Sequence, residues 1–112
     1  MESQDLKKLV RFSPDHVVRE PVHETERLWT ELVCLSSNQR LGPIRDHDSD
    51  AIFLVVAGEA AFQVDGRRKR LGQWGTVMVP AGGEIVATNA SVDPLVLLVV
   101  AAPPPIPRQV TG

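Results

Sequence analysis

The side chains most able to do chemistry lie together in the stretch RDHDSD, residues 45–50, directly before an apolar run. Its alternating aspartates begin in the manner of a calcium-binding loop, which also needs a glycine after them and a glutamate at its end. The sequence has Ala51 and Ala57 at those two positions. We therefore interpret the aspartates as a solvated acidic lead-in to a strand.

The histidine of this stretch has two interpretations. If the segment is extended, side chains alternate between two faces, so Arg45, His47 and Ala51 share one face and the aspartates share the other. A neutral imidazole can act as a base or a hydrogen-bond partner near pH 7. We expect His47 beside Arg45 at the rim of a pocket, where it contacts a ligand or holds a structural hydrogen bond.

The elements that must position these residues are short and apolar. No segment has helical spacing over three turns, apart from a short turn near residues 5–10. Turn residues separate the apolar segments, and helical crossovers for a parallel sheet are absent. The sequence therefore predicts an all-β, mostly antiparallel sandwich or barrel. The expected strands cover residues 28–36, 52–57, 60–64, 67–71, 76–79, 84–88 and 95–101.

Length and charge narrow the function classes. The chain has 112 residues, enough for one core, and a net charge of −2, which gives no reason to expect nucleic-acid binding. We interpret the basic run RRKR, residues 67–70, as a charged edge strand. The longest apolar run, residues 94–102, is about half the ~20 residues of a membrane-spanning helix. We expect neither a nucleic-acid nor a membrane partner.

Cysteine usage and the chain ends indicate the compartment and the domain layout. The single cysteine, Cys34, is expected to be buried and inert, and together with an N-terminus unlike a secretory signal it favours the cytoplasm. Residues 1–23 are expected to form an N-terminal arm, either flexible or paired as a strand with a second subunit. Residues 24–102 form the predicted barrel, and residues 103–112 a proline-rich tail.

Two glycine-anchored motifs in the right order resemble those of the small single-domain cupins over residues 32–100. The sequence AAFQVDG follows the first motif, and the second motif contains a Pro-x-Gly turn followed by an asparagine. The resemblance implies an antiparallel double-stranded β-helix, that is, a jelly-roll barrel. The residues that carry it are Gly42, His47, Gly58, Gly75, Pro80, Gly82 and Asn89.

The resemblance also implies a metal-ligand set that this sequence has mostly lost. Cupins place a His-x-His pair and a glutamate in the first motif and one further histidine in the second. Here these positions hold Arg45, His47, Ala51 and Ile85. A guanidinium cannot coordinate a cation, and losing three ligands should abolish useful affinity. We therefore expect no metal and no cofactor.

The same positions predict the pocket that replaces the metal centre. An apolar cup with a cationic rim suits a small amphipathic molecule that carries a carboxylate, because arginine pairs with carboxylates in a bidentate manner. The alternative is that Phe53 and Ile85 fill a barrel this small and leave no cavity. The expected rim is Arg45 and His47, and the expected wall is Ala51, Phe53, Val55, Ile85 and Ala87.

The opposite face of the apolar strands is apolar as well. Ile52, Leu54 and Val56 alternate with the wall residues, and a strand that is apolar on both faces must be covered on both. Since a barrel has one interior, we expect part of its outer face to be buried in a homodimer. Candidate interface residues are Trp29, Phe12 and Leu9.

Three functions fit these features. The favoured one is a cupin-like protein that binds a small molecule without a metal and without catalysis. The alternative is a cupin-type enzyme, an isomerase or dioxygenase, with a noncanonical metal site or metal-free acid/base chemistry, for which Glu31 and Glu84 are the candidate partners of His47. The third is a structural role with a filled barrel.

Overall fold

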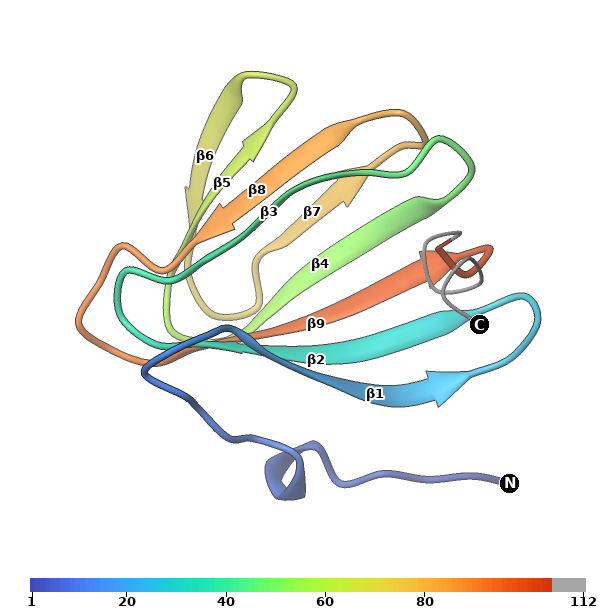
Figure 1. Cartoon of the computed structure of the whole chain (residues 1–112), viewed down its shortest axis with the longest axis horizontal. Coiled ribbons are helices and arrows are strands. Elements are labelled where there is room, and N and C mark those ends of the chain that lie inside the picture. Colours follow the sequence, from blue (N-terminus) through green and yellow to red (C-terminus); the bar gives the residue numbers. More distant parts are fainter. Residues whose placement is uncertain (106–112) are drawn as a thin grey trace.

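Short apolar segments that alternate with turn residues form β-strands along most of the chain. The computed structural model describes residues 1–105, which contain nine strands and one short 3₁₀ helix (Figure 1). The predicted all-β, antiparallel fold class is therefore confirmed. The helix η1 is Leu6–Lys8, and the strands are β1 Val18–Glu24, β2 Trp29–Leu35, β3 Arg40–Arg45, β4 Asp50–Ala57, β5 Ala60–Val64, β6 Arg67–Leu71, β7 Thr76–Val79, β8 Glu84–Thr88 and β9 Leu95–Ala102.

The strands form two antiparallel sheets that face each other, as Figure 1 shows. The larger sheet has the order β1-β2-β9-β4-β7 and the smaller one the order β3-β8-β5-β6. Neighbours in each sheet are mostly distant in sequence, so the chain crosses repeatedly between the sheets. This topology brings the first residues of β2 and β4 and the last residues of β3 and β9 to one end of the molecule.

Four strands, β5 to β8, have the bounds expected from the sequence, and β2, β4 and β9 differ from expectation by one or two residues. β1 and β3 were not expected as strands of this barrel. Each contains a proline, Pro21 or Pro43, and each shows a register shift at that proline. Both strands lie at a sheet edge, where a residue without an N–H group is tolerated.

The N-terminal region therefore contributes to the barrel of its own chain. The barrel was expected to start at residue 24, whereas β1 begins at Val18 and pairs with β2. At the other end, Pro103 to Pro105 are described, and the rest of the expected tail, residues 106–112, lies outside the described residues. Within residues 1–105, no helix has the length and apolar character needed to span a membrane.

The core lies between the two sheets and is built from the inner faces of both. Phe53 of β4 and Phe62 of β5 meet edge to face at its centre, with ring centroids 6.3 Å apart. Val55, Leu35 and Leu97 surround them and are fully buried. This packing fills the barrel at the end opposite to the ends of β3 and β9.

A second apolar cluster covers part of the outer face of the larger sheet. Leu32 and Cys34 of β2 point outward there, and Leu6 and Leu9 from the N-terminal segment pack on them. The chain thus buries by itself some of the surface that the sequence analysis assigned to a second subunit. Trp29 was wrongly expected in that interface, because it lies on the inner face of β2 with Val33 and Leu35 and lines the barrel interior.

Candidate functional site

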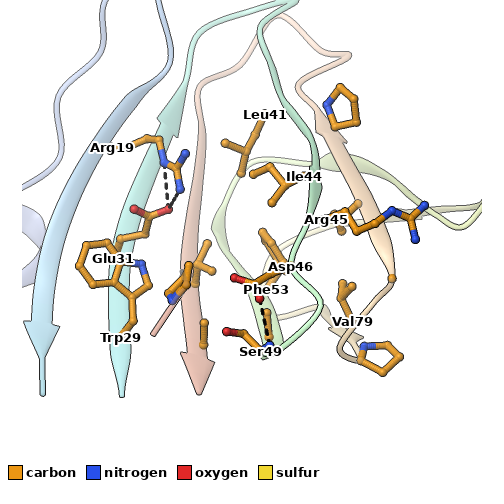
Figure 2. Close-up of a pocket in the computed structure, with 18 residues that line it drawn as sticks. Arg19, Trp29, Glu31, Leu41, Ile44, Arg45, Asp46, Ser49, Phe53 and Val79 are labelled. Carbon is orange, nitrogen blue, oxygen red and sulfur yellow. Dashed lines mark hydrogen bonds and ion pairs between the residues drawn. The ribbon is translucent and has the colours of Figure 1, made fainter. Parts of the chain in front are cut away.

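A cavity of about 520 Å³ opens between the sheets at the end where β2 and β4 begin and β3 and β9 end (Figure 2). Its volume lies within the range of small-molecule sites, roughly 300 to 1,000 Å³. The barrel interior is therefore open at one end and filled at the other.

Apolar side chains from both sheets form most of the cavity wall. Of the predicted wall residues, Ala51, Phe53 and Ile85 line the cavity. Val55 and Ala87 share their face but lie deeper along the strands, where they are fully buried in the core and do not reach the cavity. The wall residues that alternation did not identify include Leu41, Ile44, Val79, Val99 and Ala101.

The expected cationic rim is only partly present. Arg45 lies at the cavity edge, but its guanidinium donates to the carbonyl oxygen of Gly82 and lies 3.7 Å from the Glu84 carboxylate. Figure 2 shows this guanidinium directed away from the cavity centre. Its charge is therefore engaged on the outer side of the rim.

His47 lies outside the cavity. The carboxylate of Asp46 accepts the backbone N–H groups of Asp48, at 2.9 Å, and Ser49, at 3.2 Å, which bends the chain directly after β3. The strand-like alternation assumed from the sequence ends at this turn. As a result His47 is exposed in the loop, while Asp46 and Ser49 line the cavity. The aspartates were thus wrongly expected to share one face that points away from the pocket.

A partly buried ion pair from β1 and β2 contributes to the polar part of the wall. Arg19 donates through Nε, at 3.0 Å, and through Nη2, at 2.5 Å, to the same carboxylate oxygen, Oε1 of Glu31 (Figure 2). The Glu31 side chain is 5% exposed and that of Arg19 is 48% exposed. Trp29 lies beside them in the cavity wall.

The second carboxylate oxygen of Glu31, Oε2, keeps its capacity to accept a hydrogen bond. Within residues 1–105, Oε2 of Glu31 accepts no hydrogen bond, and no buried side-chain oxygen or nitrogen is left without a partner. Oε2 is therefore not fully enclosed by protein atoms, and the Glu31 side chain is part of the cavity lining. The cavity wall therefore includes a carboxylate that can accept a further hydrogen bond.

Comparisons with solved structures identify the fold. TT1209 from Thermus thermophilus is 32% identical to this chain, with a TM-score of 0.88 over 92% of this chain and 98% of that one. An RmlC-like cupin protein from Desulfovibrio desulfuricans is 26% identical, with a TM-score of 0.80 over 92% and 97% of the two chains. This chain belongs to the cupin superfamily. No protein-family model matches this cupin, and no curated protein matches it at a significant level.

A third structure shows the same fold at lower identity. The conserved protein with a double-stranded β-helix domain from Klebsiella pneumoniae is 21% identical, with a TM-score of 0.85 over 92% of this cupin and 90% of that chain. The resemblance that the glycine-anchored motifs indicated is thereby confirmed at the level of the whole barrel.

The residues of this cupin do not fit the metal centre that its superfamily implies. The four ligand positions hold Arg45, an exposed His47, Ala51 and Ile85, and only the imidazole among them could donate to a metal. Within residues 1–105, no three His, Cys, Asp or Glu side chains are grouped so that they could hold a metal ion. The cavity of this cupin therefore presents an apolar wall and an ion pair at the place of the ligand set.

Sequence reasoning missed the ion pair for two reasons. Arg19 lies on β1, which was expected to be part of an arm, and the facing of Glu31 on β2 was left open. One signal was available. Glu31 lies two residues before Val33 and four before Leu35, which are core residues. Because side chains alternate along a strand, this spacing places Glu31 on the inner face of β2.

Proposed function

We propose that this cupin binds a small, largely apolar molecule in its barrel cavity without a metal, and that the Arg19–Glu31 pair recognises the polar end of that molecule. The observation that carries the proposal is the Glu31 carboxylate, which lines a largely apolar cavity and has one oxygen that accepts no hydrogen bond within residues 1–105. Such a combination of apolar wall and a few placed polar groups is typical of ligand sites.

The charges of the site favour an uncharged polar group on the ligand. Glu31 Oε2 can accept a hydrogen bond, and Arg19 keeps donors beyond the two that Glu31 uses, so a hydroxyl group can satisfy both. A ligand carboxylate would meet the negative charges of Glu31 and Asp46 in the same cavity. Because Arg45 is engaged with Gly82 and Glu84, we replace the carboxylate ligand expected from the sequence with an alcohol.

Matched pairs of compounds test this preference. Each pair has the same apolar body and ends in an alcohol or in a carboxylate, and each compound is screened for its shift of the thermal unfolding midpoint. We expect alcohols to stabilise the protein more than their carboxylate partners do. If the carboxylates give the larger shifts, the assignment of the polar end is wrong.

A variant pair tests the role of the ion pair. Glu31→Gln keeps the side-chain shape and removes the charge of the acceptor, so we expect alcohols to bind about 10-fold more weakly, as the loss of a charge-assisted hydrogen bond implies. Glu84→Gln removes the same charge on the outer side of the rim and should leave binding unchanged. Shifts are measured relative to each unliganded variant, which separates binding from stability. Equal affinities for Glu31→Gln and wild type would overturn the proposal.

The enzymatic alternative is tested on the same samples. Glu31 and Asp46 are two carboxylates that line one cavity, which is the arrangement that metal-free acid/base chemistry would require. Each compound that binds is incubated with the protein and followed by NMR of the compound. An unchanged spectrum over many hours supports binding alone, and a time-dependent change that Glu31→Gln abolishes supports an enzyme.

A further inference from the structure

A second hollow lies on the outer face of the smaller sheet, on the opposite side of that sheet from the barrel cavity. It has a volume of about 460 Å³, and we call it the outer basin. One row of residues crosses it, since Arg40 pairs with Thr88, Thr88 with Ala61, and Ala61 with Arg70. The small side chains in the middle of this row leave the hollow between the arginines.

The walls of the outer basin are cationic. Arg40 of β3 stands on one side, and Arg68 and Arg70 of β6 stand on the other. Arg70 donates to the Glu59 carboxylate at 3.0 Å. Across residues 1–105, no ion pair is made by Arg40 or Arg68. Of the three guanidinium groups of the basin, only that of Arg70 pairs with a carboxylate within residues 1–105, in a chain whose net charge is −2.

The dimensions of the basin favour a compact anion. Strands lie about 4.8 Å apart, so the two walls, three strand spacings apart, are separated by about 14 Å between Cα atoms. Along β6 the wall spans only Arg68 to Arg70, about 7 Å. Side chains from both walls can reach an anion on the floor, whereas an extended peptide or nucleic-acid strand would run beyond the charged residues.

We propose that the outer basin binds a compact polyanion, such as a phosphate ester or a polycarboxylate, through Arg40, Arg68 and Arg70. Guanidinium groups recognise phosphate and carboxylate oxygens in a bidentate, charge-assisted manner. The hydroxyl of Thr88 and the amide of Gln63 lie in the lining and offer further hydrogen bonds to the same oxygens. β6 lies at a sheet edge, as the sequence predicted, and the proposal gives its arginines a ligand in addition to edge protection.

Calorimetric titration of the full chain with pyrophosphate and, separately, with citrate tests the proposal. We expect one saturable site whose affinity falls steeply with salt. Arg40→Gln and Arg68→Gln should each weaken binding about 10-fold, because each removes a charge-assisted contact from a different wall. The matched control is Arg67→Gln, which makes the same charge change on the other face of β6, outside the basin, and should bind as wild type does.

The titrations distinguish between the possible ligands of the outer basin. A preference for pyrophosphate assigns the site to phosphate esters, and a preference for citrate assigns it to polycarboxylates. The proposal would be overturned if neither pyrophosphate nor citrate showed saturable binding. It would also be overturned if Arg40→Gln, Arg68→Gln and Arg67→Gln weakened binding equally, because equal effects indicate attraction by a diffuse surface charge. Binding of polyglutamate or an oligonucleotide but of neither small probe would also overturn it. The three substituted residues, Arg40, Arg67 and Arg68, are exposed. An unchanged unfolding midpoint is therefore expected for each variant and is checked.

Discussion

Glu31 is a nearly buried carboxylate whose partner, Arg19, is half exposed. A buried pair of this kind often contributes little net stability, because the desolvation of the charges offsets their attraction. Removing one partner is costly, since the other charge remains buried. This is consistent with the proposal that the pair recognises a ligand rather than stabilising the barrel.

This view predicts the result of a double-mutant cycle. Arg19→Met should destabilise the protein by about 2 kcal/mol or more, because it leaves Glu31 buried without its partner. The double variant Arg19→Met/Glu31→Leu should recover most of that loss. Urea unfolding measures both values. A double variant no more stable than Arg19→Met alone would contradict this view, and losses that simply add would show that the two side chains are not energetically coupled.

Cys34 gives a pH dependence with a definite sign. Burial raises the pKa of the Cys34 thiol from its ordinary value of 9.0, with Arg11 acting in the opposite sense. The folded protein therefore keeps this proton to higher pH than the unfolded chain does. The stability due to the protonated thiol is fully present below about pH 9 and is lost as pH rises toward the raised pKa of the folded state.

We expect the difference in unfolding free energy between wild type and Cys34→Ala to shrink above about pH 9, by at most about 1.4 kcal/mol per pH unit. Urea unfolding of both proteins from about pH 7 to about pH 10.5 measures this difference. The thiol should also react with a thiol reagent only slowly before unfolding, since it is fully buried. A difference in unfolding free energy that is constant over this pH range would contradict a raised pKa of the Cys34 thiol in the folded protein.

At the scale of elements, the strands that the sequence predicted well are those bounded by turn residues. β5 and β6 meet at Asp65 and Gly66, both with positive φ, and such a pair fixes a two-residue hairpin from local sequence alone. β1 and β3 could not be found in this way, because their prolines conflict with strand propensity. Their pairing is fixed by partners distant in sequence, which local patterns do not reveal.

The same contrast between local pattern and tertiary contact applies to the candidate site. Alternation along β4 and β8 assigned Ala51, Phe53 and Ile85 to one face, and these residues line the cavity, because regular strands carry a pattern of period two. It failed for His47, since the turn made by Asp46 interrupts the strand. The Arg19–Glu31 pair required knowledge of which strand lies beside β2, and that information is tertiary.

Gly58, between β4 and β5, offers a test of local backbone geometry. Its φ is +85°, and a Cβ atom there would lie 2.3 Å from the carbonyl oxygen of Pro94. Gly66 has a similar φ of +83° with open space around it. We expect Gly66→Ala to cost about 1 to 2 kcal/mol from the strained φ alone. Gly58→Ala should cost at least about 1 kcal/mol more, because backbone must move.

Chemical denaturation of the two alanine variants measures this difference. Both variants carry the same new atom at nearly the same φ, so their comparison isolates the close approach to Pro94. Equal losses of stability would show that the strand end beside Gly58 shifts at no cost.

For the whole molecule, the outer face of the larger sheet remains partly uncovered. The N-terminal segment covers β2 and its surroundings, whereas Ile52 of β4 and Met78 of β7, which are register partners, are 46% and 63% exposed. Leu54 and Val100 adjoin them on the same face. We propose that this remaining patch is the contact between two copies of the chain, since a contiguous apolar surface is typical of such contacts.

Light scattering at tens of micromolar protein should then give twice the mass of the chain. Met78→Lys places a charge in the contact and should shift the equilibrium to the monomer. Val92→Lys adds the same charge at an exposed loop position, away from the patch, and should leave the dimer intact. A wild-type protein that stays monomeric at these concentrations would rule out the proposed contact.

The positions of the two tryptophans provide an optical readout. The chain has two tryptophans and no tyrosine, and Trp29, at 8% exposure, lines the cavity, whereas Trp74 is 68% exposed. Trp74→Phe would leave a single indole emitter in the cavity wall. Its emission wavelength and quenching would then report the arrival of any molecule beside Glu31 directly, without a label and before the identity of that molecule is known.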